Sequence, residues 1–491
     1  MGDHEVETTE DQRTVRIGKL EALREAGVNP YPYKYDITHR SKQIIDSFED
    51  LEESKLEVAA AGRIMTIRVM GKAGFCHIQD DLGQIQIYFK KDSVGDDLYA
   101  LYKQLDIGDI IGCRGKVFRT KRGEISIWAE SFEILAKALR PLPEKWHGLK
   151  DVETRYRQRY LDLISNPDVR NVFLTRGKII RSIRDFLDDK GFIEVETPIL
   201  QPLYGGASAE PFTTYHNRLG MKLFLRIADE LYLKRLIVGG FEKVYEVCKD
   251  FRNEGLDRAH SPEFTMVELY QAYADYSDIM ELYRELVIHV TRETLGTSVL
   301  KYQDQEVELD CEWDRLQMLE AIAKFAGIDS ESLDDNELIE ACKEKQIEID
   351  ESRGRGKIID DIFKEKVQPN LIQPTFITDH PVEMSPLAKV HRNNPKLTER
   401  FQPYVCGFEM GNAFSELNDP LDQRERFELQ KQLSKLGDKE AQMLDEDFLR
   451  AMEYGMPPTG GLGFGVDRLV MLLTNQTNIR EVLLFPQLKP E

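Results

Sequence analysis

Residues 245–270, YEVCKDFRNEGLDRAHSPEFTMVELY, form the stretch around which the rest of the chain is organised. Apolar and polar residues alternate over 241–247 and again over 264–270, a pattern typical of two strands. Gly255 and Pro262 mark turns in the segment between them. The stretch therefore predicts a strand, a loop and a second strand.

The loop of this hairpin collects charged side chains, namely Arg252, Glu254, Arg258, His260 and Glu263. An arginine binds a phosphate or a carboxylate through two parallel hydrogen bonds. A glutamate accepts a hydrogen bond from an exocyclic amine, and the ring of Phe264 can stack on a purine. The hairpin thus suits a polyanion that carries a base. A solvated charged hairpin without a ligand is the alternative, and the loop alone does not separate the two.

Length and composition describe a globular chain of two or more domains. The 491 residues are 41% hydrophobic and 31% charged, and no apolar run approaches the roughly 18 residues of a membrane span. The acidic start, MGDHEVETTEDQR, matches neither a signal peptide nor a transit peptide. Six scattered cysteines without a C-x-x-C pair favour a reducing cytoplasm over a disulfide framework or a zinc site.

The charge of the chain is unevenly distributed. A net charge of −21 disfavours binding to nucleic acid over the whole surface. Residues 61–150 nevertheless contain more Lys and Arg than Asp and Glu. This asymmetry marks the N-terminal part as a separate unit that tolerates a polyanion.

Residues 56–135 contain about five strand-like segments, with a helical segment at 98–105 between the third and the fourth. Five strands with one helix in that place predict an oligonucleotide-binding barrel. Phe75 lies near the basic Arg68 and Lys72, and Gln84 and Gln86 share one face of the third segment. An aromatic ring next to arginine and glutamine offers a stacking platform, a phosphate contact and an amide for an unstacked base. The alternative is that Phe75 belongs to the barrel core.

A Pro-punctuated linker near 140–150 marks a domain boundary. The stretch NVFLTRGKIIRSIRDFLDDKGFIEVETPIL after it predicts an amphipathic helix that ends at Gly191 and a strand that ends at Pro198. This helix and strand are a candidate dimer element, with packing on their own domain as the alternative. Glu230 falls in the first turn of a later helix, where a carboxylate is favourable in any helix.

Glycines 461, 463 and 465 lie on a strand that leads into a helix carrying Asp467 and Arg468. Their spacing is not the G-x-G-x-x-G of a dinucleotide site. An arginine and free backbone N–H groups at a helix start suit an anionic ligand.

Three segments in order, GFIEVETPIL, FRNEG…HSPEFTMVELY and GLGFGVDRLVMLL, resemble the signatures of class II aminoacyl-tRNA synthetases. LRIADELYLKRL and FSELNDP are similar to the lysyl-tRNA synthetases of subclass IIb. The resemblance implies an α+β chain, with a five-stranded OB-fold barrel followed by an antiparallel sheet flanked by helices. The expected parts are a helical extension (1–55), an anticodon-binding barrel (56–140), a linker (141–165), and a catalytic domain (166–491) with a helical insertion at about 297–365.

The resemblance also implies an activity. ATP and L-lysine would give lysyl-adenylate and pyrophosphate, and the lysyl group would pass to the 3′ end of tRNA(Lys). Mg²⁺ would accompany ATP, and the enzyme would be a cytoplasmic homodimer without a membrane partner.

Site residues follow from the same resemblance. Those implied for ATP are Arg252, Glu254, Arg258, His260, Phe264, Glu409 and Arg468, with Arg252 and Arg468 as the catalytic pair. Those implied for lysine are Gly206, Glu230, Arg252, Glu268, Tyr270, Asn412, Phe414 and Glu416. Glu409 would hold Mg²⁺; Arg68, Phe75 and Gln86 would contact the central uridine of the anticodon, and Pro198 would lie in the dimer interface.

The chain departs from the family pattern near the mouth of the site. Gln402 replaces a glutamate that helps to hold metal, and further departures are Glu210, Tyr215, Gly220, Cys248, Lys249 and Ser261. A paralogue that loads lysine onto a protein would lack the barrel. An aspartyl or asparaginyl enzyme would need a cation where this chain offers Glu230 and Glu416. A tRNA- or partner-binding module without catalysis is the third alternative.

Overall fold

The computed structural model describes residues 2–143, 149–350, 354–435 and 442–490, and the chain divides into two compact units, Met1–Gly148 and Leu149–Glu491. Each unit has its own hydrophobic core. The expected bounds of the four parts stay predictions, and residues 144–148 of the expected linker lie outside the described residues.

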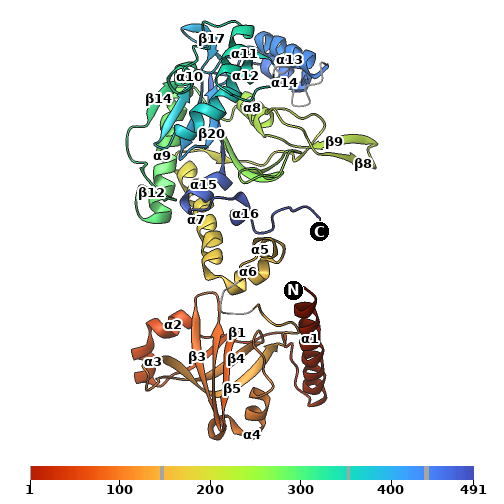
Figure 1. Cartoon of the computed structure of the whole chain (residues 1–491), viewed down its shortest axis with the longest axis vertical. Helices are drawn as coiled ribbons and strands as arrows, with labels where there is room; N and C mark the ends of the chain where they lie inside the picture. Colours follow the sequence, from red (N-terminus) through yellow and green to blue (C-terminus); the bar gives the residue numbers. More distant parts are fainter. Residues whose placement is uncertain (1, 144–148, 351–353, 436–441, 491) are drawn as a thin grey trace. The chain divides into compact units, whose positions relative to one another are not determined.

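The first unit is a barrel preceded by helices (Figure 1). Its strands are β1 (Glu57–Met70), β2 (Ala73–Gln79), β3 (Gln84–Lys90), β4 (Ile110–Arg119) and β5 (Ile125–Ala136). They close in the order β1-β2-β3-β5-β4, and only β3 and β5 pair in parallel. Its helices are α1 (Gly2–Glu25), α2 (Ser41–Asp46), α3 (Phe48–Ser54) and α4 (Lys91–Tyr102). The five-stranded barrel with a helix after its third strand is confirmed.

Strand alternation explains the barrel core. Cys76 and Ile78 on β2, and Ile85 and Ile87 on β3, are buried in one cluster. Phe89 of β3 belongs to the same cluster, and most of the other members come from β1, β4, β5 and the helices around them. Successive side chains of a strand point to opposite faces, so each strand fills the barrel with every second residue.

The second unit is organised on a nine-stranded sheet. Its strands are β14 (Asp314–Gln317), β15 (Thr375–Thr378), β18 (Arg400–Val405), β20 (Gly411–Ser415), β21 (Thr459–Gly465), β11 (Glu263–Ala272), β10 (Lys243–Phe251) and β6 (Ile193–Glu194), in this spatial order, with β19 (Phe408–Glu409) beside β18. Neighbouring strands are antiparallel except for β14–β15 and β10–β6. β10 and β11 confirm the predicted hairpin.

Helices cover one face of this sheet. α7 (Pro167–Asp189), α9 (Tyr276–Leu295) and α15 (Val466–Leu473) share a core with the sheet residues Val267 and Leu269. Because side chains alternate along β11, residues 264, 266, 268 and 270 face the opposite side. That side is left for the cavity described below.

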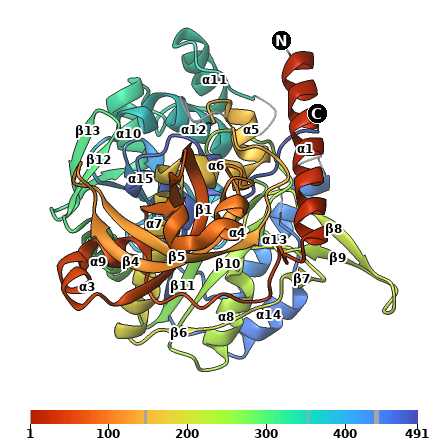
Figure 2. The same ribbon diagram turned by 90° about the horizontal axis from the view of Figure 1, so that it is seen from below.

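Smaller elements surround the sheet. β7 (Leu200–Gln201), β8 (Thr213–His216) and β9 (Met221–Leu225) form a three-stranded sheet, from which the β8–β9 hairpin projects away from the rest of this unit in Figures 1 and 2. The helices α5 (Val152–Arg157), α6 (Arg159–Ser165), α8 (Glu230–Val238), α13 (Pro420–Lys435), α14 (Glu446–Glu453) and α16 (Ile479–Val482), and the hairpin of β16 (Val390–His391) with β17 (Asn394–Thr398), complete the unit together with the insertion.

The insertion expected at 297–365 is only partly helical. It begins with the hairpin of β12 (Val299–Tyr302) and β13 (Gln305–Glu308), followed by β14 of the main sheet. The turn needs Gln303 in the left-handed region, at a φ of 51°, and the burial of Leu300 and Val307 follows a strand period. Helix begins only at α10 (Met318–Ala326) and continues in α11 (Asp335–Glu344) and α12 (Arg355–Ile362).

Among the described residues, every helix is too short or too polar to cross a bilayer.

Candidate active site

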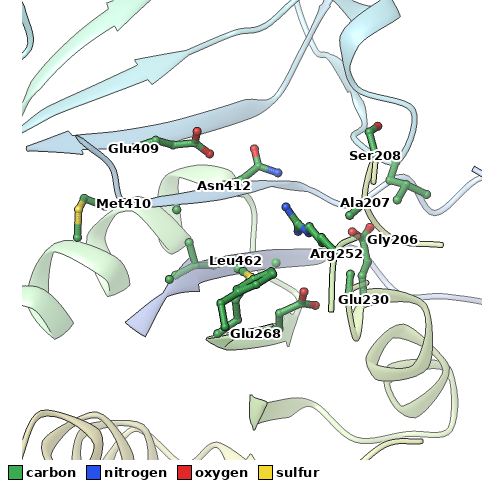
Figure 3. A pocket seen from close by; sticks show the side chains of 18 of the residues that line it. Gly206, Ala207, Ser208, Glu230, Arg252, Glu268, Glu409, Met410, Asn412 and Leu462 are labelled. Carbon is green, nitrogen blue, oxygen red and sulfur yellow. The ribbon is translucent and has the colours of Figure 1, made fainter. Parts of the chain in front are cut away.

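A cavity of about 510 Å³ opens on the face of the sheet that the three core helices leave free. Its lining comes from β11, β20 and β21, from the start of α8, and from the loop between β10 and β11. Figure 3 shows Arg252, Glu230 and Glu268 together, with Asn412 and Glu409 across the cavity from Glu268. Segments that lie far apart in the sequence therefore meet at one site.

The registers of three adjacent strands build the floor. Glu268 pairs with Gly463, and Gly463 pairs with Asn412, so these three residues form one row across β11, β21 and β20. Tyr270, Gly461 and Phe414 form the next row. Residues two apart on a strand share a face, so both rows point into the cavity.

Glycine on the central strand keeps the floor open. A Cβ at Gly461 would lie 2.0 Å from Glu416 Oε1 and 2.5 Å from the ring of Tyr270. A Cβ at Gly463 would lie 3.1 Å from the methyl group of Met266. A side chain at these two positions would occupy the space that the flanking strands leave, and the glycine spacing of the sequence thus reflects a floor rather than a phosphate loop.

One end of the cavity is acidic. Glu230 begins α8, Glu416 follows β20, and both are almost completely buried. Burial raises the pKa of the Glu230 carboxyl and raises that of Glu416 well above its usual range. Lys234, one turn further along α8, contacts both carboxylates. Glu268 is buried as well, and the hydroxyl of Tyr270 donates to its Oε2 at 3.2 Å.

The middle and the opposite end are cationic. The guanidinium of Arg252 lies 5.1 Å from the centroid of the Phe264 ring. Arg468 donates from Nη1 to the carbonyl oxygen of Glu409 at 2.7 Å, and its Nη2 lies 3.2 Å from His260 Nε2. His260 is oriented in turn by Asp257, whose Oδ2 is 2.8 Å from Nδ1. Arg252 and Arg468 both line the cavity, so this part of it favours an anionic ligand.

The structure gathers nearly all of the predicted ATP and lysine residues around this cavity. Arg258 is the exception among them, and Gln402, at the expected metal position, does not line the cavity either. Arg258 is exposed, and its carbonyl oxygen accepts from the backbone N–H of Ile479 at 2.8 Å. Gln402 Oε1 accepts from His380 Nε2 at 2.8 Å. His380 is fully buried, and burial lowers its pKa to about 3, so the ring is neutral.

Four cations near the cavity were not predicted from the sequence: Lys234, Arg400, Lys357 and Lys364. Arg400 Nε donates to Asn412 Oδ1 at 2.8 Å. Lys357 and Lys364 both bind Asp360 Oδ2, at 3.1 and 2.8 Å. The spacing of Glu230 and Lys234 by four residues on a predicted helix was a readable signal, whereas the other three carry none.

On the barrel, Arg68 and Phe75 are direct partners across β1 and β2. Phe75 is half-buried, and its ring centroid lies 4.8 Å from that of Tyr88 on β3. Gln86 is buried, and its side chain accepts from Ser126 Oγ at 2.9 Å and donates to Glu124 at 2.7 Å. The amide of Gln86 is thus held by neighbours on β5 and in the turn before it.

The chain belongs to the class II tRNA synthetases. The family described as tRNA synthetases class II (D, K and N) matches residues 151–489, and the OB-fold nucleic acid binding domain matches residues 58–135. The chain is 56% identical over 477 residues to a lysine–tRNA ligase of Carboxydothermus hydrogenoformans, with 97% of each chain covered. It is 54% identical over 493 residues to that of Bacillus subtilis (99% of each). The corresponding figure for Pelotomaculum thermopropionicum is 57% over 479 residues (97% of this chain, 94% of the relative).

Proposed function

We propose that this chain activates L-lysine with ATP and transfers the lysyl group to tRNA(Lys). The observation that carries the proposal is the pair of buried carboxylates, Glu230 and Glu416, at one end of a cavity whose centre holds Arg252. An ammonium at the acidic end would place the carboxylate of the same amino acid toward Arg252. The names of the relatives support lysine as that amino acid.

In the first step a lysine carboxylate oxygen attacks the α-phosphorus of ATP. The new bond joins that oxygen to phosphorus, the bond between the α-phosphorus and its bridging oxygen breaks, and pyrophosphate leaves. The attacking carboxylate is already ionised, so no general base is required. Arg252 would hold the carboxylate and the α-phosphate together, so catalysis rests on orientation and on charge stabilisation.

The adenine would stack between Phe264 and Arg468, with its amine at Glu254. His260 and Arg258 would contact the outer phosphates of ATP. His260 already lies beside Arg468. Arg258 lies on the exposed loop, so it would have to turn toward the phosphates when ATP binds.

The donor set of the site fits one Mg²⁺. Glu409 offers a carboxylate to the cavity, an oxygen donor of the kind that Mg²⁺ prefers. Gln402 is hydrogen-bonded to His380, and Asp360 forms ion pairs with Lys357 and Lys364. We therefore propose a single ion held by Glu409 together with phosphate oxygens and water. Such an ion supplies charge neutralisation at the phosphates.

Specificity would come from the lysine end of the cavity. Phe414 would lie along the apolar stem, with Tyr270 beside the ammonium. Glu268 and the backbone at Gly206 would take the α-amine. Lys234 balances only one of the two buried negative charges, so an uncharged isostere of lysine would leave the other without a counter-charge, which would disfavour such substrates.

The barrel would bind the anticodon through Arg68, Phe75 and Gln86.

We also propose a homodimer that uses the edge strand β6 and the exposed Pro198, because Ile193, Ile199 and Leu200 expose apolar surface there. Six cysteines without a disulfide agree with a cytoplasmic location. Sedimentation analysis would show a monomer if the dimer proposal were wrong.

The test is ATP–pyrophosphate exchange with each amino acid in turn, without tRNA. Lysine-dependent exchange is the expected result, and exchange with aspartate or asparagine would contradict the pocket. No exchange with any amino acid, together with binding of a tRNA that has a UUU anticodon, would instead establish a binding module without catalysis.

A further inference from the structure

A buried lysine of the chain itself lies at the acidic end of the cavity. Lys234 is fully buried, its Nζ lies 2.5 Å from Glu230 Oε1, and it also contacts Glu416 Oε2. The ring centroid of Phe414 lies 5.4 Å from the same nitrogen. Glu230 and Glu416 line the cavity, and Lys234 is not among the described residues that do so. The resident ammonium therefore lies behind the two carboxylates and not in the space for a ligand.

The two oxygens of Glu416 face different sides. Oε2 contacts Lys234, whereas Oε1 lies over the cavity floor, where a Cβ on Gly461 would come within 2.0 Å of it. Glu230 likewise contacts Lys234 through Oε1 and also lines the cavity. Each carboxylate thus has a resident partner and still faces the position of a bound ammonium.

The position of Lys234 affects the balance of charge at the acidic end of the cavity. Two carboxylates that met only one substrate ammonium would keep an excess negative charge in a buried site, which is strongly unfavourable. With Lys234, two carboxylates meet two ammonium groups when the substrate is bound. Arg400 also acts on Glu230 through its charge, but its guanidinium donates to Asn412 Oδ1 and to the carbonyl oxygen of Met384, whereas Lys234 contacts both carboxylates directly.

We propose that Lys234 is a specificity-determining positioning residue, which fixes Glu230 and Glu416 and sets the net charge of these three side chains to minus one, so that this end of the cavity takes a ligand with one ammonium group. The proposal rests on the proposed activation of lysine. It assigns Lys234 an electrostatic role that a space-filling side chain could not replace.

A charge cycle tests the role, with ATP–pyrophosphate exchange as the readout. Lys234→Met keeps the length of the side chain and removes the charge. We expect the KM for lysine to rise about tenfold or more, because the two carboxylates then repel each other, with the KM for ATP within about twofold. Glu416→Gln leaves one carboxylate paired with Lys234 and should also raise the KM for lysine. The double variant restores a net charge of minus one, and its KM for lysine should fall below that of either single variant.

The outcomes show whether Lys234 has this electrostatic role. A KM for lysine within about twofold of wild type in Lys234→Met, or a double variant worse than both singles, would overturn the proposal. Lys222→Met, an exposed site on β9, is the matched control and should leave both KM values unchanged. If Lys234→Met does not fold, the double variant is compared with Glu416→Gln instead. The proposal then predicts that the double variant has the higher thermal stability and the lower KM for lysine. A wild-type chain without lysine-dependent exchange would overturn the proposed function as well.

Discussion

Single side chains on the cavity floor decide how much space a substrate has. Gly461 lies between Tyr270 and Phe414 in one cross-strand row, under Glu416. The residue is glycine because the side chains of both neighbouring strands converge over it. Its substitution therefore acts on the site more directly than on the strand.

Gly461→Ala should raise the KM for lysine about tenfold or more, equivalent to about 1.4 kcal/mol of binding free energy. The added methyl group would displace Glu416, whose Oε1 lies 2.0 Å from the built Cβ. Steady-state exchange kinetics measure the effect. Gly18→Ala on α1, where nothing lies within 4 Å of the built Cβ, is the control. An unchanged KM in Gly461→Ala would show that Glu416 does not contact the substrate.

His380 makes the stability of the second unit sensitive to pH. Its pKa is about 3 in the folded chain because the ring is buried, and lies near 6.5 in the unfolded chain. The unfolded state therefore binds the proton first, and stability is lost as the pH falls from about 6.5 toward 3.

His380→Gln should remove this contribution. By pH 5 the wild type should have lost about 2 kcal/mol more of its free energy of unfolding than the variant. Urea unfolding at several pH values measures the difference, with the exposed His216→Gln as control. Parallel pH profiles for wild type and His380→Gln would contradict the assignment.

Among the elements, the junction of β21 and α15 places Arg468. Asp467 in the first turn of α15 is buried; its Oδ2 accepts from the backbone N–H of Thr265 on β11 at 2.7 Å, and its Oδ1 contacts Arg176 of α7 at 2.5 Å. Arg176 also donates to Thr265 Oγ1 at 2.9 Å. One aspartate therefore joins a helix of the core, a strand of the site and the helix that carries Arg468.

Asp467→Asn should lower stability by about 2 kcal/mol, because the partly buried guanidinium of Arg176 would lose its charged partner. It should also lower the exchange rate, since the neighbouring Arg468 would shift from the phosphate end of the cavity. Thermal unfolding and exchange kinetics measure the two effects. Asp185→Asn, exposed on α7, is the control and should change neither. A stable Asp467→Asn variant would show that the junction does not depend on this ion pair.

At the scale of the whole molecule, the proposed function assigns a different task to each of the two units. The cavity is lined entirely by described residues of the second unit, and the residues that we propose for anticodon binding lie on the barrel of the first. Lysine activation and tRNA binding should therefore respond to different substitutions.

Phe75→Ala should raise the KM for tRNA in aminoacylation about tenfold, because stacking on an aromatic ring contributes about 1–3 kcal/mol per base. It should leave lysine-dependent exchange unchanged. Phe132→Leu, buried in the same barrel, controls for loss of barrel stability. Equal losses in both assays for Phe75→Ala would place the ring in the core rather than on the binding surface.

The sequence by itself determined the elements and their chemistry. Alternation predicted the β10–β11 hairpin and the five barrel strands, because a strand period is a local property of the chain. Motif spacing and the resemblance selected Arg252, Glu230, Glu416 and Arg468. Strand registers, however, are set by pairing between distant segments.

Only the tertiary structure decided what depends on that pairing. It placed Gly461 and Gly463 between β11 and β20, and turned Gln402 toward His380. It also put Lys234 behind the two carboxylates that face the cavity. A lysine at helical spacing from a glutamate predicts an ordinary surface ion pair. Glu416 lies 182 positions after Lys234 in the sequence. The burial of Lys234 between the two glutamates is therefore a consequence of tertiary packing alone.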